Sequence, residues 1–201
     1  MLVHNLRRSV VMALVWLVLL GFVYAFVGTG VAQLFFKYQA DGSINANTSG
    51  SVLIGQNWTS PKWFHGRPDD FGPYAANPKK NVSGGDNPLV ANGVSGESAA
   101  TNLGPRSATL LANAKDLVAW WHTQGVNPTP DLVTTSGSGY DPDITPVDAT
   151  AEIPMVSGAT GLSRANLMAL IKRQTHGEEL GFLGSQYIVV LQLNEALAKL
   201  R

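Results

Sequence analysis

Residues 9–36 have the sequence SVVMALVWLVLLGFVYAFVGTGVAQLFF, without a single charged side chain. An α-helix rises about 1.5 Å per residue, so about 20 residues cross the roughly 30 Å hydrocarbon core of a bilayer. The stretch exceeds that length, and a helix bonds every backbone amide internally, as surrounding lipid requires. The sequence therefore predicts a membrane-spanning helix over residues 10–36, preceded by a short segment, residues 1–9.

The charges beside this stretch indicate its orientation. Arg7 and Arg8 precede it directly, whereas Lys37 on the far side is accompanied by Asp41. The cytoplasmic flanks of membrane helices carry an excess of Lys and Arg. Residues 1–9 are therefore expected in the cytoplasm, and the part of the chain after the helix on the outer, periplasmic face of a bacterial inner membrane. A cleaved signal peptide is the alternative, but its apolar region is usually only about 7 to 15 residues long.

The remainder of the chain predicts one soluble domain, residues 51–201, behind a small, polar linker, residues 37–50. Its length suffices to bury a core. Without Arg7 and Arg8 the net charge is about −2 and no basic run occurs, which argues against a nucleic-acid partner. The chain has no cysteine, which excludes disulfides and thiolate metal sites.

Local signals predict three helices in this domain. Apolar residues recur at steps of three and four over residues 105–124. Thr145 is a candidate N-cap before a helix that Pro154 is expected to keep short, because proline cannot donate a helical hydrogen bond. Ser163 is expected to open a third helix that ends near Gly177.

Strands are predicted where short apolar or β-branched runs are bounded by turn residues. They are expected over residues 51–56, 131–135 and 187–193, with a terminal helix or turn after the last, whereas residues 61–104 are expected to be irregular. Strands scattered among helices indicate an α+β or α/β domain, small and soluble, behind a single N-terminal transmembrane helix.

Templates for catalysis and metal binding do not match. The four histidines have no metal-binding spacing, and no serine has a nucleophile-elbow motif. Asp141, Asp143 and Asp148 could hold a calcium ion, but an EF-hand's glycine and distal glutamate are missing, and turn and helix-cap roles explain them more simply. We expect no catalytic residue, no metal and no intrinsic cofactor.

One glycine-serine loop, SGSGYDPD at residues 136–143, allows two interpretations. Consecutive backbone amides can form an anion nest, which makes it a weak candidate for nucleotide binding, although it lacks the lysine of a Walker loop. The alternative is a structural turn, in which the glycines adopt positive φ and the aspartate bonds its own backbone. The residues concerned are Ser136, Gly137, Ser138, Gly139 and Asp141.

Aromatic and hydrogen-bonding residues are dense in GQNWTSPKWFHGRP, residues 55–68. Such a composition suits a protein interface, where Trp, Phe and Arg dominate binding energy, and it equally suits the core of a small domain. Both interpretations stay open for the interface candidates Gln56, Trp63, Phe64 and Arg67.

A second candidate interface lies in the apolar helix. Gly21, Ala25, Gly28 and Ala32 recur at spacings of four and three, a small-residue stripe on which another transmembrane helix can approach closely. The alternative is ordinary apolar sequence that faces lipid.

Several strings, taken in order behind one membrane span, resemble the C subunit family of the Kdp-type potassium-transporting P-type ATPases of bacteria and archaea. The resemblance runs nearly from end to end and rests on GSVLIGQNW, WFHGRP, SGG, TNLGP, DLVTTSGSGYDPDITP and VVLQLNEAL. Three features depart from the family pattern: residues 86–100 form an insertion, Tyr140 replaces a common leucine, and the region from Met155 to Thr160 lacks the usual basic residues.

The resemblance implies an accessory, non-enzymatic subunit of a potassium import complex, beside a potassium-binding channel-like subunit and an ATP-hydrolysing subunit. The chain lacks both the aspartyl-phosphate motif DKTGT and a filter such as TVGYG. The family is described as stabilising the complex and as a catalytic chaperone that raises ATP affinity, with ATP reached through the complex. The predicted topology favours assembly. A membrane-anchored or secreted binding module or hydrolase unrelated to transport is the rival hypothesis.

Overall fold

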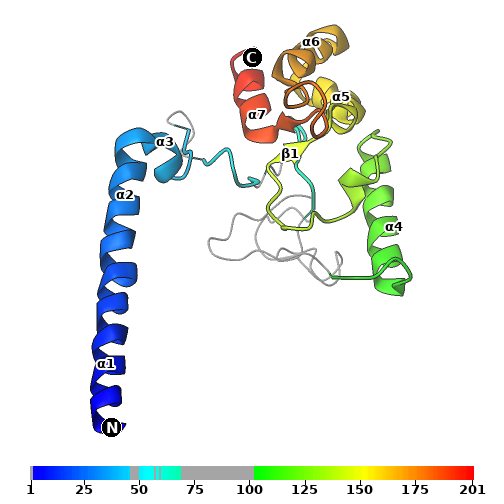
Figure 1. The fold of residues 1–201 in the computed structure, drawn as a ribbon. Helices are drawn as coiled ribbons and strands as arrows, with labels where there is room; N and C mark the ends of the chain where they lie inside the picture. The colour runs from blue at the N-terminus through cyan, green and yellow to red at the C-terminus, as the bar shows by residue number, and fades with distance from the viewer. Residues whose placement is uncertain (1, 46–49, 57, 59, 69–101) are drawn as a thin grey trace. The chain divides into compact units, whose positions relative to one another are not determined.

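The computed structural model describes residues 2–45, 50–56, 58, 60–68 and 102–201 (Figure 1). The chain divides into two units, Met1–Ile44 and Asn45–Arg201. The first is built around one long helix, and the second is a mixed domain of helices with a small sheet. The insertion predicted at residues 86–100 lies outside the described residues.

The N-terminal unit contains one continuous helix, Leu2–Phe35, that is long and apolar enough to cross a membrane. It comprises α1 (Leu2–Val18), a π-helical turn η1 (Leu19–Val23) and α2 (Tyr24–Phe35), and none of the residues in these segments is buried. At about 1.5 Å per residue its length exceeds the thickness of the hydrocarbon core. The predicted helix is present, and it begins before residue 10 because nothing in the preceding residues breaks it.

Asp41 collects hydrogen bonds from the end of this helix and from the next turn, α3 (Lys37–Ala40). Lys37 Nζ donates to Asp41 Oδ2 at 2.8 Å, and Gln33 Nε2 donates to Asp41 Oδ1 at 3.1 Å. The hydrogen bond from Lys37, followed by that from Gln33, lowers the pKa of Asp41. The only basic side chain of this flank is therefore paired with an acid.

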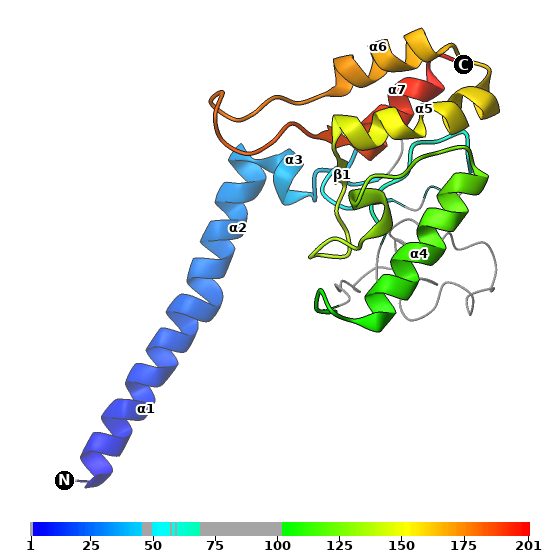
Figure 2. The ribbon, with the colours of Figure 1, turned by 90° about the vertical axis from the view of Figure 1, so that its right-hand side faces the viewer.

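The C-terminal unit is an α+β domain with one two-stranded antiparallel sheet. Strand β1 (Asp143–Ile144) pairs with β2 (Ile188–Val189), with Asp143 opposite Val189 and Ile144 opposite Ile188. Helices α5 (Pro146–Thr160) and α7 (Val190–Ala198) follow directly from the two strands, and α6 (Arg164–Gln174) packs against both helices (Figures 1 and 2). The antiparallel pairing favours the α+β alternative over α/β.

The core of this domain joins α4 (Ala108–Thr123) to the other helices and to the segment near residue 64. Trp121 is fully buried, and its indole Nε1 donates to the carbonyl oxygen of Leu132 at 3.0 Å. The largest buried side chains are Trp121, Phe64, Leu117, Leu132, Ile153, Leu167, Leu170, Ile188, Leu193 and Leu197.

Two predicted helices are confirmed, α6 together with its predicted cap Ser163 and α4 with a cap, Ser107, that was not predicted. Ser107 Oγ accepts from Leu110 N at 3.3 Å at the start of α4, and Ser163 Oγ accepts from Asn166 N at 3.2 Å at the start of α6. Gly125 follows α4 at φ +73°, as expected of a terminating glycine. These signals are local, so the sequence alone carries them.

Two predicted strands are wrong. Residues 51–54 form a turn, in which Leu53 N donates to Ser51 Oγ at 3.1 Å, and Leu53 is exposed rather than in a buried strand. Residues predicted as the strand 131–135 begin with a 3₁₀ turn, η2 (Asp131–Val133). The β-branched composition of that run favours a strand, but the tertiary contact prevails, because the buried Trp121 of α4 donates a hydrogen bond to the carbonyl oxygen of Leu132 in the middle of the turn.

The helix predicted at Thr145 starts at the expected residue but is longer than expected. Thr145 Oγ1 accepts from Asp148 N at 3.2 Å and Asp148 Oδ2 accepts from Thr145 N at 2.8 Å, a complete capping box. Helix α5 then continues past Pro154 to Thr160. Pro154 is exposed, while its neighbour Ile153 is buried.

The strand predicted over residues 187–193 is confirmed only at Ile188 and Val189. The sheet ends where Val190 N donates to Pro142 O at 3.0 Å, and the chain continues as α7. Buried residues at Leu193 and Leu197 follow a helical spacing, so a short apolar run was ambiguous between strand and helix.

Candidate functional site

The loop of residues 134–143, which leads into β1, bonds three of its polar side chains to its own backbone. Ser136 Oγ accepts from Gly139 N at 2.9 Å, and Ser138 Oγ accepts from Tyr140 N at 3.1 Å. Asp141 Oδ1 accepts from Asp143 N at 3.1 Å, which is the expected bond of the aspartate to its own backbone. These are the contacts that a structural turn requires, and the predicted bond of Asp141 to its own backbone is present.

The two glycines of this loop differ. Gly139 has φ +74°, a left-handed conformation that favours glycine. Gly137 is not among the residues with positive φ, and a Cβ atom added there would meet nothing within 4 Å. The expectation of positive φ is therefore correct for Gly139 and wrong for Gly137.

Arg67 connects this loop to the segment around residue 65. Its Nη2 donates to the carbonyl oxygen of Thr135 at 3.2 Å, and its Nη1 lies 3.5 Å from Asp141 Oδ2. Asp131 Oδ1 lies 3.7 Å from Nη2. The half-buried guanidinium group thus joins the beginning and the middle of the loop.

Two further segments bond to the backbone of the same loop. Gly55 N donates to Tyr140 O at 3.0 Å, and Val190 N donates to Pro142 O at 3.0 Å. Together with Arg67, these contacts bring three separate stretches of the sequence to one loop. The loop is consequently a junction of the domain.

The backbone of residues 64–65 is held by side chains rather than by a sheet. Asn194 Oδ1 accepts from Phe64 N at 2.9 Å, and Asn194 Nδ2 donates to Phe64 O at 2.8 Å. His65 N donates to both carboxylate oxygens of Glu152, at 3.2 and 3.0 Å. Helices α5 and α7 therefore each supply one polar side chain that fixes this segment.

His65 and Glu152 form a buried side-chain pair. His65 Nδ1 lies 2.8 Å from Glu152 Oε2, and the side chains are 1% and 0% exposed. Burial raises the pKa of Glu152, the hydrogen bonds from His65 oppose that rise, and the charge of Asp148 adds to it. The rings of Trp120 and Trp121 lie edge-on to the imidazole. Since neither group reaches the surface, the pair is suited to structure rather than to proton transfer.

A small pocket of about 160 Å³ lies beside Arg67 and is lined by four aspartates. Burial, and secondly the neighbouring Asp141, raise the pKa of Asp143 to about 6, against an opposing effect of His176. Asp143 Oδ1 is buried without a hydrogen-bond partner. Asp148 is engaged by its capping box and by Thr129 Oγ1. Within the described part of the chain, no three His, Cys, Asp or Glu side chains are grouped as metal ligands would be.

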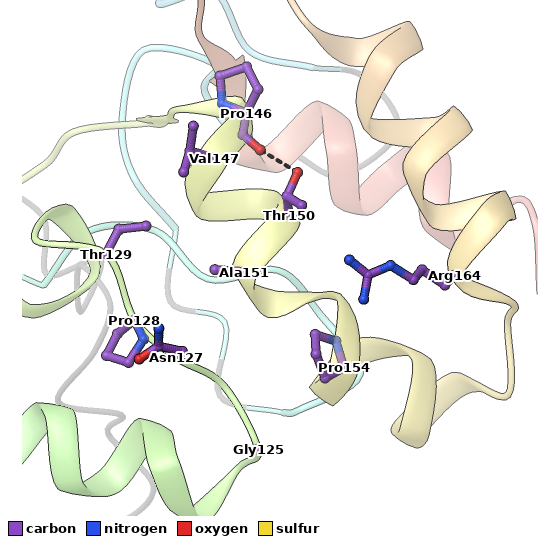
Figure 3. Close-up of a pocket in the computed structure, with 10 residues that line it drawn as sticks. All are labelled: Gly125, Asn127, Pro128, Thr129, Pro146, Val147, Thr150, Ala151, Pro154 and Arg164. Carbon is purple, nitrogen blue, oxygen red and sulfur yellow. Dashed lines mark hydrogen bonds between the residues drawn. The ribbon is translucent and has the colours of Figure 1, made fainter.

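A larger, shallow groove of about 680 Å³ lies between residues 125–129 and α5 (Figure 3). Pro128, Val147 and Pro154 give it apolar walls. Arg164 extends from α6 and points its guanidinium group toward α5 (Figure 3). Among the described residues that line this groove none is acidic, and Arg164 is the charged one.

The structure places the predicted interface residues of the domain differently from one another. Phe64 is fully buried, so the core interpretation applies to it. Trp63 is half-buried, with its ring centroid 5.5 Å from that of Trp58. Gln56 Nε2 donates to the carbonyl oxygen of Ile54 at 2.9 Å, and Arg67 bonds within the junction described above.

The two glycines of the small-residue stripe have no close neighbour among the described residues. A Cβ atom added at Gly21 or Gly28 would meet nothing within 4 Å. Gly21 lies in the π-helical turn, whereas Ala25, Gly28 and Ala32 lie in α2. At Gly21 and Gly28 the stripe is therefore accessible to a partner helix in the part of the chain that the structure describes.

Sequence reasoning missed Asn194 and Glu152. Each is a polar residue in an otherwise apolar buried face, Asn194 beside Leu193 and Glu152 beside Ile153. A polar residue within a buried apolar face is the sequence signal that could have identified them, because a buried polar side chain requires a specific hydrogen-bond partner. The partners themselves lie 130 and 87 residues away in sequence.

Comparison with known proteins identifies similar chains. The family described as "KdpC: K+-transporting ATPase, c chain" matches residues 6–199. The potassium-transporting ATPase KdpC subunit of Koribacter versatilis (strain Ellin345) is 39% identical over 195 residues, which cover 94% of this chain and 92% of the relative. That of Caulobacter vibrioides (strain NA1000 / CB15N) is 39% identical over 202 residues, with 98% and 93% covered. That of Methylococcus capsulatus is 36% identical over 207 residues, with 100% of both chains covered.

Proposed function

The chain belongs to the KdpC family, the c chains of K+-transporting ATPases, and on that premise we propose that it is a non-pumping subunit that stabilises the assembly of the transporter. Its partners are the potassium-binding, channel-like subunit and the ATP-hydrolysing subunit, within a lipid membrane. The chain itself neither hydrolyses ATP nor selects the ion.

The hydrogen bonding of the 134–143 loop is the observation that supports a role in assembly over a role in nucleotide binding. Both serine hydroxyl groups of SGSG accept bonds from amides of the same loop. A triphosphate needs accessible donors. Arg67, the loop's guanidinium neighbour, already donates through Nη2 to Thr135 and faces two carboxylates, and its Nε, which has no partner, is buried. The loop is accordingly proposed to act as a structural junction that holds the domain's shape.

The charges beside the apolar helix support a domain outside the cytoplasm. Lys37 is paired with Asp41 at 2.8 Å, whereas Arg7 and Arg8 have no ion-pair partner among the described residues. The positive charge that resists translocation is thus concentrated before the helix. A domain on the outer face of a bacterial inner membrane is separated from cytoplasmic ATP, which again favours assembly.

The apolar helix is proposed to contribute to assembly through its small-residue stripe. Since no described residue comes within 4 Å of a Cβ atom added at Gly21 or Gly28, a second helix can approach closely there, and close packing drives helix association in lipid. The helix therefore serves as an anchor and as a contact.

Purification of the transporter from membranes tests the assembly role. An affinity tag on the ATP-hydrolysing subunit should retain the channel-like subunit when this chain is co-expressed and lose it, by about tenfold or more, when the chain is omitted. Equal recovery of both subunits without this chain would contradict the proposal.

Titration of the purified full-length chain with ATP tests the rival chaperone role. Millimolar ATP should leave its melting temperature unchanged. A rise in melting temperature whose underlying stabilisation grows with ATP concentration as RT ln(1 + [L]/Kd) would instead assign nucleotide binding to this chain.

A further inference from the structure

The segment between α6 and β2, residues 176–187, forms an ordered ribbon that extends beyond the ends of helices α5 to α7 (Figure 2). At its base, His176 N donates to Tyr187 O at 2.8 Å and Tyr187 N donates to His176 O at 3.3 Å. The two side-chain rings stack with centroids 4.8 Å apart and planes inclined by 13°. The base of the ribbon is therefore fixed by backbone and ring contacts.

The end of the ribbon is closed by a second backbone pair. Glu179 N donates to Leu183 O at 2.9 Å, and Leu183 N donates to Glu179 O at 2.9 Å. Gly181 N also donates to Glu178 O at 3.1 Å. The turn between them thus has a defined conformation.

This turn presents three large apolar side chains to solvent, here named the apolar tip. Leu180 is 81% exposed, Phe182 is 71% exposed and Leu183 is 49% exposed. Single exposed apolar residues are ordinary, but a group of them on a projecting element marks an interaction site. The tip buries little apolar surface against its own domain.

The backbone of the tip has an unfavourable conformation, and packing within this domain does not compensate for its cost in free energy. Leu180 has φ +55°, in the left-handed region, where a branched side chain is disfavoured. Gly181 and Gly184 adopt φ +79° and φ +80°, which glycine tolerates. A leucine held in this way and left exposed is preorganised for contact with another molecule, because its ordering is complete before binding.

The charges around the tip indicate the kind of partner. Glu178 and Glu179 directly precede it and are exposed, and the sequence has no Lys or Arg between Arg173 and Lys199. Segments that insert into the surface of an anionic membrane carry Lys or Arg beside their apolar residues, and these carry acids. An apolar pocket rimmed by basic side chains complements the tip in both respects.

We propose that Leu180, Phe182 and Leu183 dock into an apolar pocket with a Lys- or Arg-rich rim on another protein subunit of the transporter. The inference rests on the proposed assembly function and deepens it by assigning a contact. The tip supplies the buried anchor, and Glu178 and Glu179 face the basic rim.

Photo-crosslinking in the intact membrane complex tests the proposal. A benzophenone amino acid in place of Phe182 should form an adduct with another protein subunit, whereas the same probe at Leu111, which is 57% exposed on α4, should not. Adducts with phospholipid alone, no adduct, or the same protein adduct from both positions would overturn the docking. Recovery of this chain with the complex in the same sample shows whether the assembly role still holds.

Substitutions separate docking from a merely structural role of the tip. Leu180→Gly relieves the left-handed strain, so the purified full-length chain should melt at the same temperature as the parent or higher, while its dissociation from the immobilised complex should quicken at least about tenfold. Leu180→Ser with Phe182→Ser should quicken it likewise, and Leu111→Ser should leave it unchanged. Faster dissociation only in variants that also melt earlier would reject docking.

Charge reversal tests the basic rim. Glu178→Lys with Glu179→Lys should quicken dissociation from the complex, and raising the salt concentration should reduce the difference from the parent chain. Unchanged or slower dissociation would overturn the assignment of a basic rim.

Discussion

The side-chain amide of Asn194 forms two hydrogen bonds to the backbone of Phe64, one in each direction, at 2.9 and 2.8 Å. Both residues are buried, so the amide occupies the place that a neighbouring strand would take in a sheet. The backbone groups of Phe64 depend on this one side chain, because water does not reach them.

Asn194→Ala should therefore lower the free energy of unfolding by about 2–4 kcal/mol, since it leaves a buried donor and a buried acceptor unpaired. Denaturant titration of the full-length chain measures the effect. Asn166→Ala, at an exposed position of α6, is the matched control and should stay within about 0.5 kcal/mol. Equal effects of the two substitutions would contradict the role given to Asn194.

The loop glycines offer a second matched pair. Gly139→Ala forces a Cβ atom into a left-handed conformation and should cost about 1 kcal/mol, whereas Gly137→Ala meets no atom within 4 Å and should cost about nothing. Unfolding by denaturant distinguishes them. A reversed order would mean that Gly137 is the constrained position.

The raised pKa of Asp143 makes stability depend on pH. Its pKa is about 6 when folded, against 3.8 for the free side chain, so the folded state binds the proton more tightly. Stability should fall as the pH rises from about 4 to 6 and stay constant above that range. Asp143→Asn should raise the melting temperature by roughly 3 °C at pH 7.5, a gain limited by solvent screening, and change it little at pH 4.

The control for this substitution is Glu178→Gln, which removes an exposed carboxylate and should alter the melting temperature at neither pH. A gain for Asp143→Asn that is equally large at pH 4 would show that the charge is not its cause.

The small-residue stripe of the apolar helix can be tested without disturbing the chain itself. Gly21→Ile with Gly28→Ile should release the subunit from the complex while membrane insertion persists, because the added side chains collide only with a partner helix. Co-purification from solubilised membranes is the measurement. Gly30→Ile, on the opposite side of the helix, should leave recovery unchanged, and full recovery of the double variant would exclude the stripe as a contact.

The sidedness of the domain follows from the flanking charges. Protease added to intact bacterial spheroplasts should digest the chain beyond Tyr38, and a cytoplasmic protein in the same cells should survive. Protection of the domain until the membrane is lysed would reverse the orientation and favour the model in which this chain handles ATP.

The parts of the fold that were predicted correctly are those encoded by nearby residues. The caps at Thr145 and Ser163 each involve a partner three residues away, so local sequence specifies them. The apolar helix is likewise a property of one uninterrupted segment.

Several of the parts that were predicted wrongly depend on residues outside the local segment, although the turn at residues 51–54 is held by the nearby Ser51. The turn at Leu132 forms where the indole of Trp121 donates to its carbonyl oxygen. Helix α7 begins where Val190 N donates to the carbonyl oxygen of Pro142. Helix α5 continues past Pro154 because buried residues lie on both sides of it. The same difference between local and distant contacts holds for the candidate junction. Hydrogen bonds within the 134–143 loop were predicted, whereas those of Arg67, Asn194 and Glu152 were not.

The hydrogen bonds that hold Phe64 and His65 also set the order of events during biosynthesis. Phe64 precedes Asn194 by 130 residues, and His65 precedes Glu152 by 87. A nascent chain that has already placed its apolar helix in the membrane must therefore keep this segment unfinished until α5 and then α7 have been synthesised. Throughout that interval the stretch that contains Trp58 and Trp63 lacks these hydrogen bonds and is a natural target for chaperones and proteases. The synthesis of Asn194 is the step that ends this exposure to quality control.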